Sequence, residues 1–219
     1  MPSEDVMSQV KKLSDTVCLV GLSKERWAGL EQEPPDAEMW SLNQGHVHLP
    51  PAIMARVTRW FQIHPWEAMS QRQDPSNGHL EFLRTTSIPV YLEELHPQEC
   101  PAGVKYPYAE VCQTIGSNYF ATNSFCYMTA LAIHEGFKQI KVYGCDFGPS
   151  DWSDGYARPA MEFMLGFAAG QRIKIWLPEN CALLTGDLYG KTAMVPSPPM
   201  EMALDIFQKL ESDLLAANK

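Results

Sequence analysis

Short apolar runs alternate along the chain with amphipathic segments, which is the pattern of an α/β protein. Six of these runs predict strands. The first is a short continuous apolar run, as strands buried on both faces of a parallel sheet are, and the last two alternate polar and apolar residues. The six runs are Thr16–Val20, Glu38–Asn43, Arg59–His64, Ser87–Leu92, Gln139–Cys145 and Arg172–Leu177. The sequence therefore predicts an α/β fold, a single doubly wound domain whose sheet of about six strands is mostly parallel.

The most distinct helical segment follows Thr122, Asn123 and Ser124, which are N-cap residue types. Apolar residues recur after them at steps of three and four, and Gly136 is the residue type that ends a helix in a left-handed conformation. Further helices are expected over residues 52–59, 158–170 and 200–215.

A long irregular segment is expected over residues 93–117, where Pro97, Pro101, Gly103 and Pro107 are closely spaced. A loop of this length is typical of a lid or a binding loop. Lys105, Tyr106 and Tyr108 would then either cover a substrate or pack back on the core.

Composition and charge limit the function classes. The 219 residues suffice for one domain, and 45% hydrophobic with 20% charged residues excludes general disorder. A net charge of -9 argues against a broad surface for nucleic acid or for an anionic membrane. No apolar run is long enough to span a bilayer and the first residues lack the apolar core of a signal peptide, so a cytoplasmic protein is expected. The six cysteines form no C-x-x-C pair, which predicts reduced, mostly buried thiols.

Polar residues directly after the predicted strands are the candidates for a site, because ligands of open α/β sheets bind outside the carboxyl ends of the strands. Asp146 is the first candidate, and its alternative role is to cap a turn. The amide of Asn43 is suited to a base or ribose, and His64 ends the third strand. Gly21 and Ser23 form the turn after the first strand, as in any α/β fold or as a phosphate-side turn.

The central stretch carries a resemblance. A helix, then GFKQI, a strand, and GCDF resemble the bacterial sialyltransferases that cap lipooligosaccharide. The same run is similar to a broader family of archaeal 6-hydroxymethylpterin pyrophosphokinases and flagellin-modifying motility accessory factors. PENCALL, after the sixth strand, resembles the C-P-N-S-L-L of the sialyltransferases. The resemblance implies one Rossmann-like nucleotide-binding transferase domain over residues 1–219, with its core at 10–195 and a C-terminal helix at 200–217.

The resemblance also implies roles for single residues. The nucleotide-binding residues would be Gly21, Ser23, Asn43, Thr122, Asn123, Ser124, Asp146 and Tyr156, of which Asn43 matches the "N-Q" that ends the second strand of the sialyltransferases. The families' first turn reads GNGPS, whereas this chain has GLSK. Their catalytic histidine follows G-x-DF, but this chain has no histidine beyond His134. A general base would therefore come from Asp151, Asp154 or His64, or the catalytic role would be absent.

Three functions remain open at this point. The first is a nucleotide-sugar-dependent glycosyltransferase without a cofactor, acting on a small molecule, a glycan or a modified base. The second is a pyrophosphokinase, in which Asp146 with Asp151 or Asp154 would hold Mg²⁺ across ATP. The third is a protein that binds a nucleotide without chemistry. None of the three conflicts with assembly into a homo-oligomer.

Overall fold

A single parallel sheet organises the chain. The computed structural model describes residues 10–67, 78–145, 147, 153–179, 181 and 183–184, with only the backbone of residues 153 and 154. In this part, seven strands, all parallel, follow the order β5-β4-β3-β2-β1-β6-β7. They are β1 Thr16–Val20, β2 Glu38–Leu42, β3 Val57–Gln62, β4 Val90–Leu92, β5 Gly103–Lys105, β6 Gln139–Tyr143 and β7 Lys174–Trp176. The predicted α/β fold is confirmed, with one strand more than expected.

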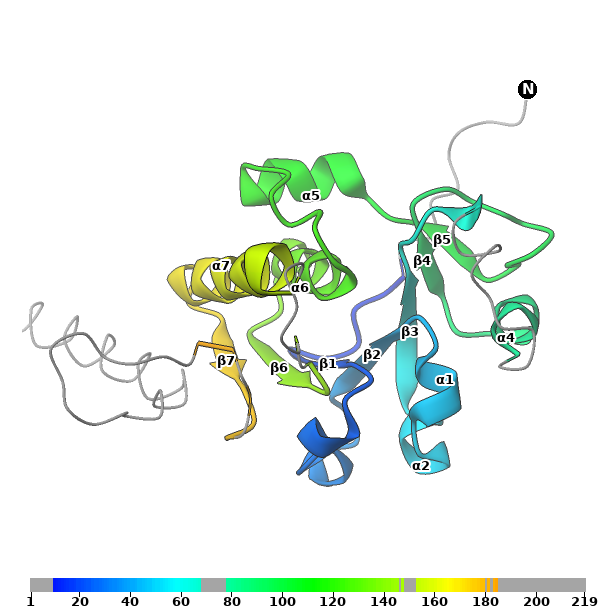
Figure 1. The fold of residues 1–219 in the computed structure, drawn as a ribbon, viewed down its shortest axis with the longest axis horizontal. Helices are drawn as coiled ribbons and strands as arrows, with labels where there is room; N and C mark the ends of the chain where they lie inside the picture. The colour runs from blue at the N-terminus through cyan, green and yellow to red at the C-terminus, as the bar shows by residue number, and fades with distance from the viewer. Residues whose placement is uncertain are drawn as a thin grey trace, which may run out of the picture.

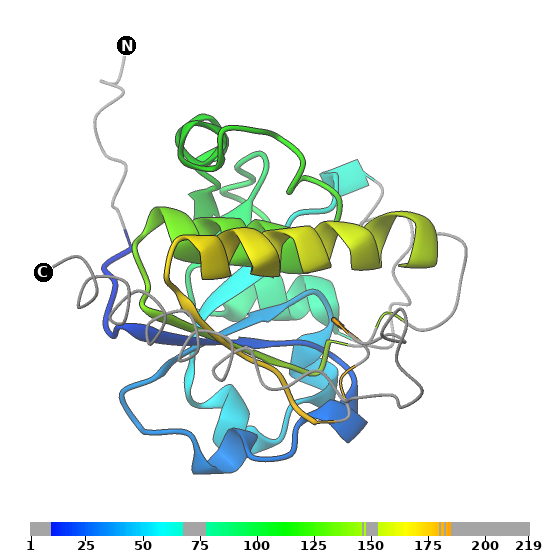
Figure 2. The same ribbon diagram turned by 90° about the vertical axis from the view of Figure 1, so that its left-hand side faces the viewer.

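Helices cover both faces of the sheet, which gives three layers (Figures 1 and 2). One face carries the longer helices α5 Tyr108–Ile115, α6 Ser124–His134 and α7 Arg158–Gly170. The other face carries the short elements η1 Lys24–Arg26, η2 Leu30–Gln32, α1 Gly45–His48, α2 Pro51–Met54 and α4 His79–Thr85. No helix in the described ranges is long and apolar enough to cross a membrane.

Alternate residues of the strands feed two separate cores, because successive side chains of a strand point to opposite faces. In β1, Val17 and Leu19 pack under α5, α6 and α7. Cys18 and Val20 face the other layer, where Ile53 of α2 and Leu83 of α4 join the core. The cysteines agree with the sequence prediction, because all six are free thiols and only Cys112 is not fully buried.

The segment 93–117 departs from the prediction of an irregular loop. It contains β5, which extends the sheet beside β4, and the whole of α5. Tyr106 packs back on the core with 3% of its surface exposed, and its hydroxyl donates to the Tyr127 carbonyl at 2.9 Å. It is therefore not a lid residue, whereas Tyr108 is 40% exposed.

Two further predictions are corrected or left untested. The helix expected over 52–59 is the single turn α2, and β3 begins at Val57, earlier than expected. Pro51 starts the turn, and the β-branched Val57 and Thr58 favour strand over helix. The expected helix 200–215 lies outside the described residues.

Helix α6 is the centre of one layer, and its sequence explains its start and end. The Asn123 side chain accepts a hydrogen bond from the Cys126 N–H at 3.1 Å, as an N-cap residue does. Nine of its eleven residues are buried, so it packs between the sheet and its neighbouring helices. Gly136 takes the left-handed conformation, with φ 70°, directly after the helix.

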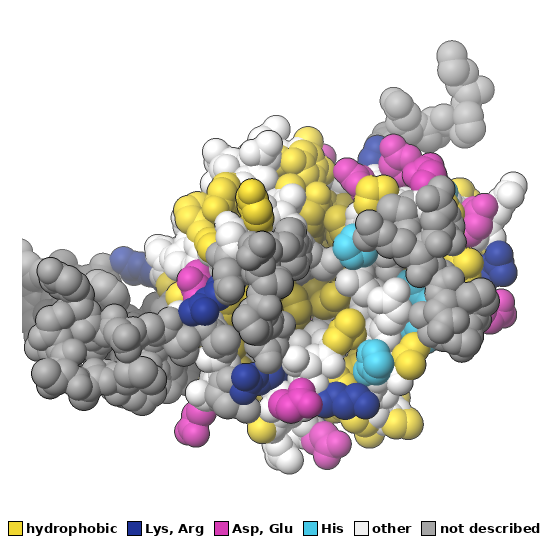
Figure 3. Space-filling model, in the orientation of Figure 1, with side chains coloured by type: hydrophobic (Ala, Val, Ile, Leu, Met, Phe, Trp, Pro, Cys, Tyr) yellow, Lys and Arg dark blue, Asp and Glu magenta, His cyan; other side chains and the backbone are white. Residues whose placement is uncertain are grey.

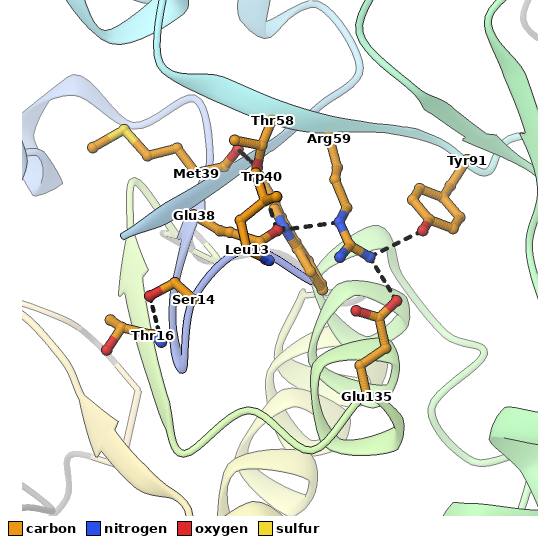
Figure 4. A network of polar contacts seen from close by, with 10 residues as sticks. All are labelled: Leu13, Ser14, Thr16, Glu38, Met39, Trp40, Thr58, Arg59, Tyr91 and Glu135. Atoms are coloured by element: carbon orange, nitrogen blue, oxygen red, sulfur yellow. Dashed lines mark hydrogen bonds and ion pairs between the residues drawn. The ribbon is translucent and has the colours of Figure 1, made fainter. Parts of the chain in front are cut away.

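A buried ionic network braces the sheet beneath the end of α6 (Figure 4). Arg59 is fully buried, and its guanidinium lies 3.2 Å from Glu38 and 2.5 Å from Glu135. It also donates to the Tyr91 hydroxyl at 3.0 Å and stacks over Trp40. Burial by itself would lower the pKa of Arg59, but its hydrogen bond to Glu135 and the nearby charges raise the pKa above its usual value. The network joins β2, β3, β4 and α6, and its partners keep the buried cation charged.

Candidate functional site

The switch point of the sheet lies between β1 and β6, where the chain changes direction across the sheet. Ligands of doubly wound folds bind at this point. Two glycines allow the strand ends to approach closely here. A Cβ atom on Gly21 would lie 2.4 Å from the Gly144 carbonyl oxygen and 2.5 Å from the Phe125 ring. Gly21, the start of α6 and the end of β6 are therefore brought together, as the sequence predicts.

The turn after β1 is closed by its own hydrogen bonds. The Gly21 N–H donates to Tyr143 at 2.8 Å and the Ser23 N–H donates to Gly144 at 3.1 Å. In return the Gly144 N–H donates to Arg26, and the Trp27 indole donates to Gly21. These N–H groups are used within the protein. The sequence of this turn differs from GNGPS, and its structure differs accordingly: the Gly21 and Ser23 amides do not form an open phosphate cradle.

Asn43 is the described site residue whose geometry points most directly to a ligand. Its N–H donates to the Phe61 carbonyl at 3.0 Å, and its carbonyl accepts from the Trp60 indole at 3.2 Å. These two bonds hold it in a left-handed conformation, with φ 47°, which is uncommon for a residue other than glycine. Its side-chain Oδ1 is buried and has no hydrogen-bond partner among the described residues. Such an unpaired buried acceptor is costly unless a ligand supplies a donor.

The N-terminus of α6 contributes a second polar surface near the switch point. The Asn123 carboxamide is occupied within the protein, because its Oδ1 caps Cys126 and its Nδ2 donates to the Ala157 carbonyl at 3.2 Å. The Tyr127 N–H also donates to Asn123. The Thr122 hydroxyl accepts from Asn123 Nδ2 at 3.3 Å. Within the described residues this leaves the Ser124 and Phe125 N–H groups, with the Ser124 hydroxyl, at the positive end of the helix. They are suited to a phosphate.

Other predicted site residues are placed only in part. Tyr156 lies in the π turn η4 Ser153–Ala157, and 66% of its surface is exposed. Through Ala157 this turn is bonded to Asn123, so Tyr156 stands near the start of α6. Asp146 and Asp151 lie outside the described residues, as does the side chain of Asp154. The roles predicted for these carboxylates remain predictions.

His64 lines a cavity of about 190 Å³ at the carboxyl ends of β3 and β4. The cavity is also bounded by Gln62, Trp66, Glu93 and Glu94, which sequence analysis did not identify. A usable signal existed, since Glu93 directly follows β4 as Asn43 directly follows β2. The same rule that selected Asn43 would have selected Glu93. Figure 3 shows the histidines of this face on the half that carries β3, β4 and α4, with acidic side chains spread around the face.

No metal centre is formed by the described side chains. Among them, no group of three histidines, cysteines or carboxylates is arranged to hold a metal ion. The carboxylates expected to bind Mg²⁺ under the pyrophosphokinase alternative are those whose side chains are not described. That alternative therefore remains a prediction from the sequence.

Comparison with known proteins supports the fold. No protein-family model matches the chain, and a comparison with curated protein sequences finds no match. Two solved structures of the sialyltransferase CstII from Campylobacter jejuni are similar. The complex with the substrate analogue CMP-3FNeuAc has a TM-score of 0.51 at 17% identity, over 76% of this chain and 82% of that one. The complex with cytidine-5'-monophosphate has a TM-score of 0.52 at 16% identity, over 89% and 99%. The chain therefore has a sialyltransferase-like α/β fold, and the resemblance stated from its motifs is confirmed at the level of the fold.

Proposed function

We propose that the chain is a nucleotide-sugar-dependent glycosyltransferase of the sialyltransferase-like type. The observation that carries this proposal is the buried, unpartnered Oδ1 of Asn43 at the carboxyl edge of the sheet. It is an acceptor held in place by the bonds to Phe61 and Trp60, and a ribose hydroxyl or a base amine would supply the missing donor. The fold shared with structures that hold CMP and a CMP-sugar analogue supports the same reading.

Different described residues would bind the leaving phosphate and activate the acceptor in such a transfer. The Ser124 and Phe125 N–H groups and the helix dipole would stabilise the charge that develops on the leaving phosphate. His64, at the end of β3, is the described candidate for the base that takes the proton from an acceptor hydroxyl. Asp151 and Asp154 remain the alternatives from the sequence.

Calorimetric titration with CMP, UDP, GDP, ATP and their sugar conjugates tests the proposal. Binding below the millimolar range, followed by transfer or hydrolysis of the bound sugar nucleotide, is the expected result. If none of these nucleotides binds, the proposal fails. Consumption of ATP that requires Mg²⁺ would favour the pyrophosphokinase instead.

Binding without turnover would favour the non-catalytic nucleotide-binding protein. The closed turn after β1 favours this non-catalytic alternative, because the Gly21 and Ser23 amides of the turn are not open to a phosphate.

Variants at Asn43 test whether nucleotide binding depends on the buried, unpartnered Oδ1 of this residue. Asn43→Gly removes the acceptor and tolerates the left-handed backbone, so nucleotide affinity should fall about tenfold, the loss of about 1.4 kcal/mol expected for one buried hydrogen bond. Asn43→Asp retains acceptor oxygens and also tolerates this backbone, so it should retain most of the affinity. The exposed Asn118→Gly is the matched control. Asp146→Asn, predicted from the sequence, should likewise weaken binding at least tenfold.

A further inference from the structure

The cavity at the ends of β3 and β4 lies on the same edge of the sheet as Asn43 but one strand further on. The Asn43 N–H is bonded to the carbonyl of Phe61, the residue before Gln62, which lines the cavity. The cavity is thus adjacent to the proposed nucleotide site and separate from the switch point. In a transferase the second substrate must reach the same edge as the first.

The inner wall of the cavity is a buried polar side chain. Gln62 is 2% exposed, and its Oε1 pairs with His79 Nε2 at 2.8 Å. This is the only hydrogen bond of the Gln62 side chain among the described residues. Because Oε1 is paired with His79, the NH₂ group of this cavity-lining residue remains as a donor for a ligand. A fixed amide of this kind is suited to orient a ligand oxygen.

The outer walls combine carboxylates with an aromatic pair. Glu67, Glu93 and Glu94 line the cavity, and its described lining contains no lysine or arginine. Trp66 stacks on His96 with ring centroids 4.3 Å apart and planes 21° from parallel. Carboxylates accept from hydroxyl or ammonium groups, and an indole held by stacking offers an apolar face to the C–H groups of a sugar ring. The same carboxylates repel an anion.

The volume limits the size of the ligand. At about 190 Å³ the cavity is smaller than the roughly 300–1,000 Å³ typical of pockets for drug-sized ligands. One pyranose ring fits such a space better than an oligosaccharide, of which the remainder would extend into solvent.

From these features we infer that the cavity is the acceptor subsite and takes a hydroxyl-rich sugar ring that carries no negative charge. The inference rests on the proposed function. It makes Trp66 the platform for the ring, Gln62 the donor to a ring oxygen or hydroxyl, and Glu93 and Glu94 the acceptors. An acceptor ending in a sialic acid or a phosphorylated sugar is selected against by the three carboxylates.

Ligand-observed NMR with three probes tests the inference on the full chain, alone and with saturating CMP. The probes are methyl β-D-galactopyranoside (neutral), D-glucosamine (cationic) and the methyl glycoside of N-acetylneuraminic acid (anionic). The first two should bind in the millimolar range and the third at least tenfold more weakly. The inference is overturned if neither of the first two binds, or if the anionic probe binds as well as they do.

Variants assign the binding to this cavity. Trp66→Ala should weaken binding of the neutral and cationic probes at least tenfold. Because Trp66 is half-buried, the exposed Glu94→Lys serves as a second variant that does not disturb packing. Glu94→Lys should weaken the binding of D-glucosamine at least tenfold and bring the affinity for the anionic probe closer to that for the neutral one. Glu31→Lys, at an exposed position in η2, is the matched charge control and should change neither. Unaltered binding in both cavity variants would contradict the inference.

The failures of the two proposals are distinguishable. Sugar binding that is lost in Trp66→Ala, in a protein that binds no nucleotide, would overturn the proposed function and leave the cavity as a sugar-binding site without an acceptor role. Nucleotide binding that depends on Asn43, without sugar binding, would keep the proposed function and overturn the subsite.

Discussion

Gly21 and Gly144 meet at the switch point so closely that a Cβ on either would overlap the other's backbone. A Cβ on Gly21 would lie 2.4 Å from the Gly144 carbonyl oxygen, and one on Gly144 would lie 2.6 Å from the Gly21 carbonyl oxygen. Neither atom belongs to a flexible side chain, so the contact cannot be relieved locally. The approach of β1 and β6 therefore depends on both glycines.

Gly21→Ala should destabilise the protein by about 1–3 kcal/mol, the usual cost of overpacking. Gly166→Ala is the matched control. Gly166 lies exposed inside α7, where an added methyl group would meet no atom within 4 Å, so alanine there should stabilise by about 0.5–1 kcal/mol. Urea denaturation of the two variants measures the expected loss and the expected gain in the free energy of unfolding. Equal effects would show that the close approach at Gly21 is not a constraint.

Arg59 should be the most sensitive position of the buried network. Arg59→Met leaves Glu38 and Glu135 without their cation and should cost about 3–5 kcal/mol. Adding Glu135→Leu should recover part of this loss, because it removes one unpaired carboxylate, while Glu38 keeps the Trp40 indole and the Leu13 N–H as donors. Denaturant midpoints of the single and double variants measure the recovery. Additive losses would contradict the role assigned to the pair.

The sequence was sufficient for the parts of the fold that depend on local pattern. β1, β2 and α7 follow from apolar periodicity, and Asn123 caps α6 as its residue type predicts. β5 could not be found in this way. Its Gly103–Lys105 has one β-branched residue, and it becomes a strand only through pairing with β4. Tertiary contact overrode a weak local signal.

The candidate site divides along the same line. Its position at the strand ends follows from topology, which a sequence pattern can predict. The conformation and the unpaired side-chain oxygen of Asn43 cannot be predicted in this way. They depend on bonds to Trp60 and Phe61, which lie 17 and 18 positions away in the printed sequence. Arg59 likewise meets Glu135 across 76 residues, and no spacing within β3 indicates that partner.

Acid should destabilise the protein through His79. Burial, with a smaller effect of the stacked His46, lowers the pKa of His79 from 6.5 to about 4. The folded state therefore favours neutral His79, and its contribution to stability is complete above pH 6.5 and lost as the pH falls toward 4. Over that range the loss should reach about 3 kcal/mol, at 1.36 kcal/mol per unit of pKa difference.

His79→Gln removes this titration. Its unfolding free energy should fall less steeply than that of the parent protein between pH 6.5 and 4, when both are measured by urea denaturation. His48→Gln, at an exposed position, is the control and should follow the parent. Parallel curves for the parent and His79→Gln would contradict the assignment.

Asn123 should act through the structure more than through direct contact with a nucleotide. Its carboxamide is shared between the Cys126 N–H and the Ala157 carbonyl, so Asn123→Ala should cost about 2 kcal/mol from the lost cap and the lost hydrogen bond. Asn123→Ser retains the cap and loses the Nδ2 donor to the Ala157 carbonyl, the Thr122 hydroxyl and the Cys126 sulfur, so about 1 kcal/mol is expected. Because the residues around it still present the Ser124 and Phe125 N–H groups, Asn123→Ser should change nucleotide affinity by less than threefold, against about tenfold for Asn43→Gly. Thermal denaturation and calorimetric titration of the same samples separate the two roles. A stable Asn123→Ser that loses tenfold in affinity would place its carboxamide on the ligand, as the resemblance alone implies.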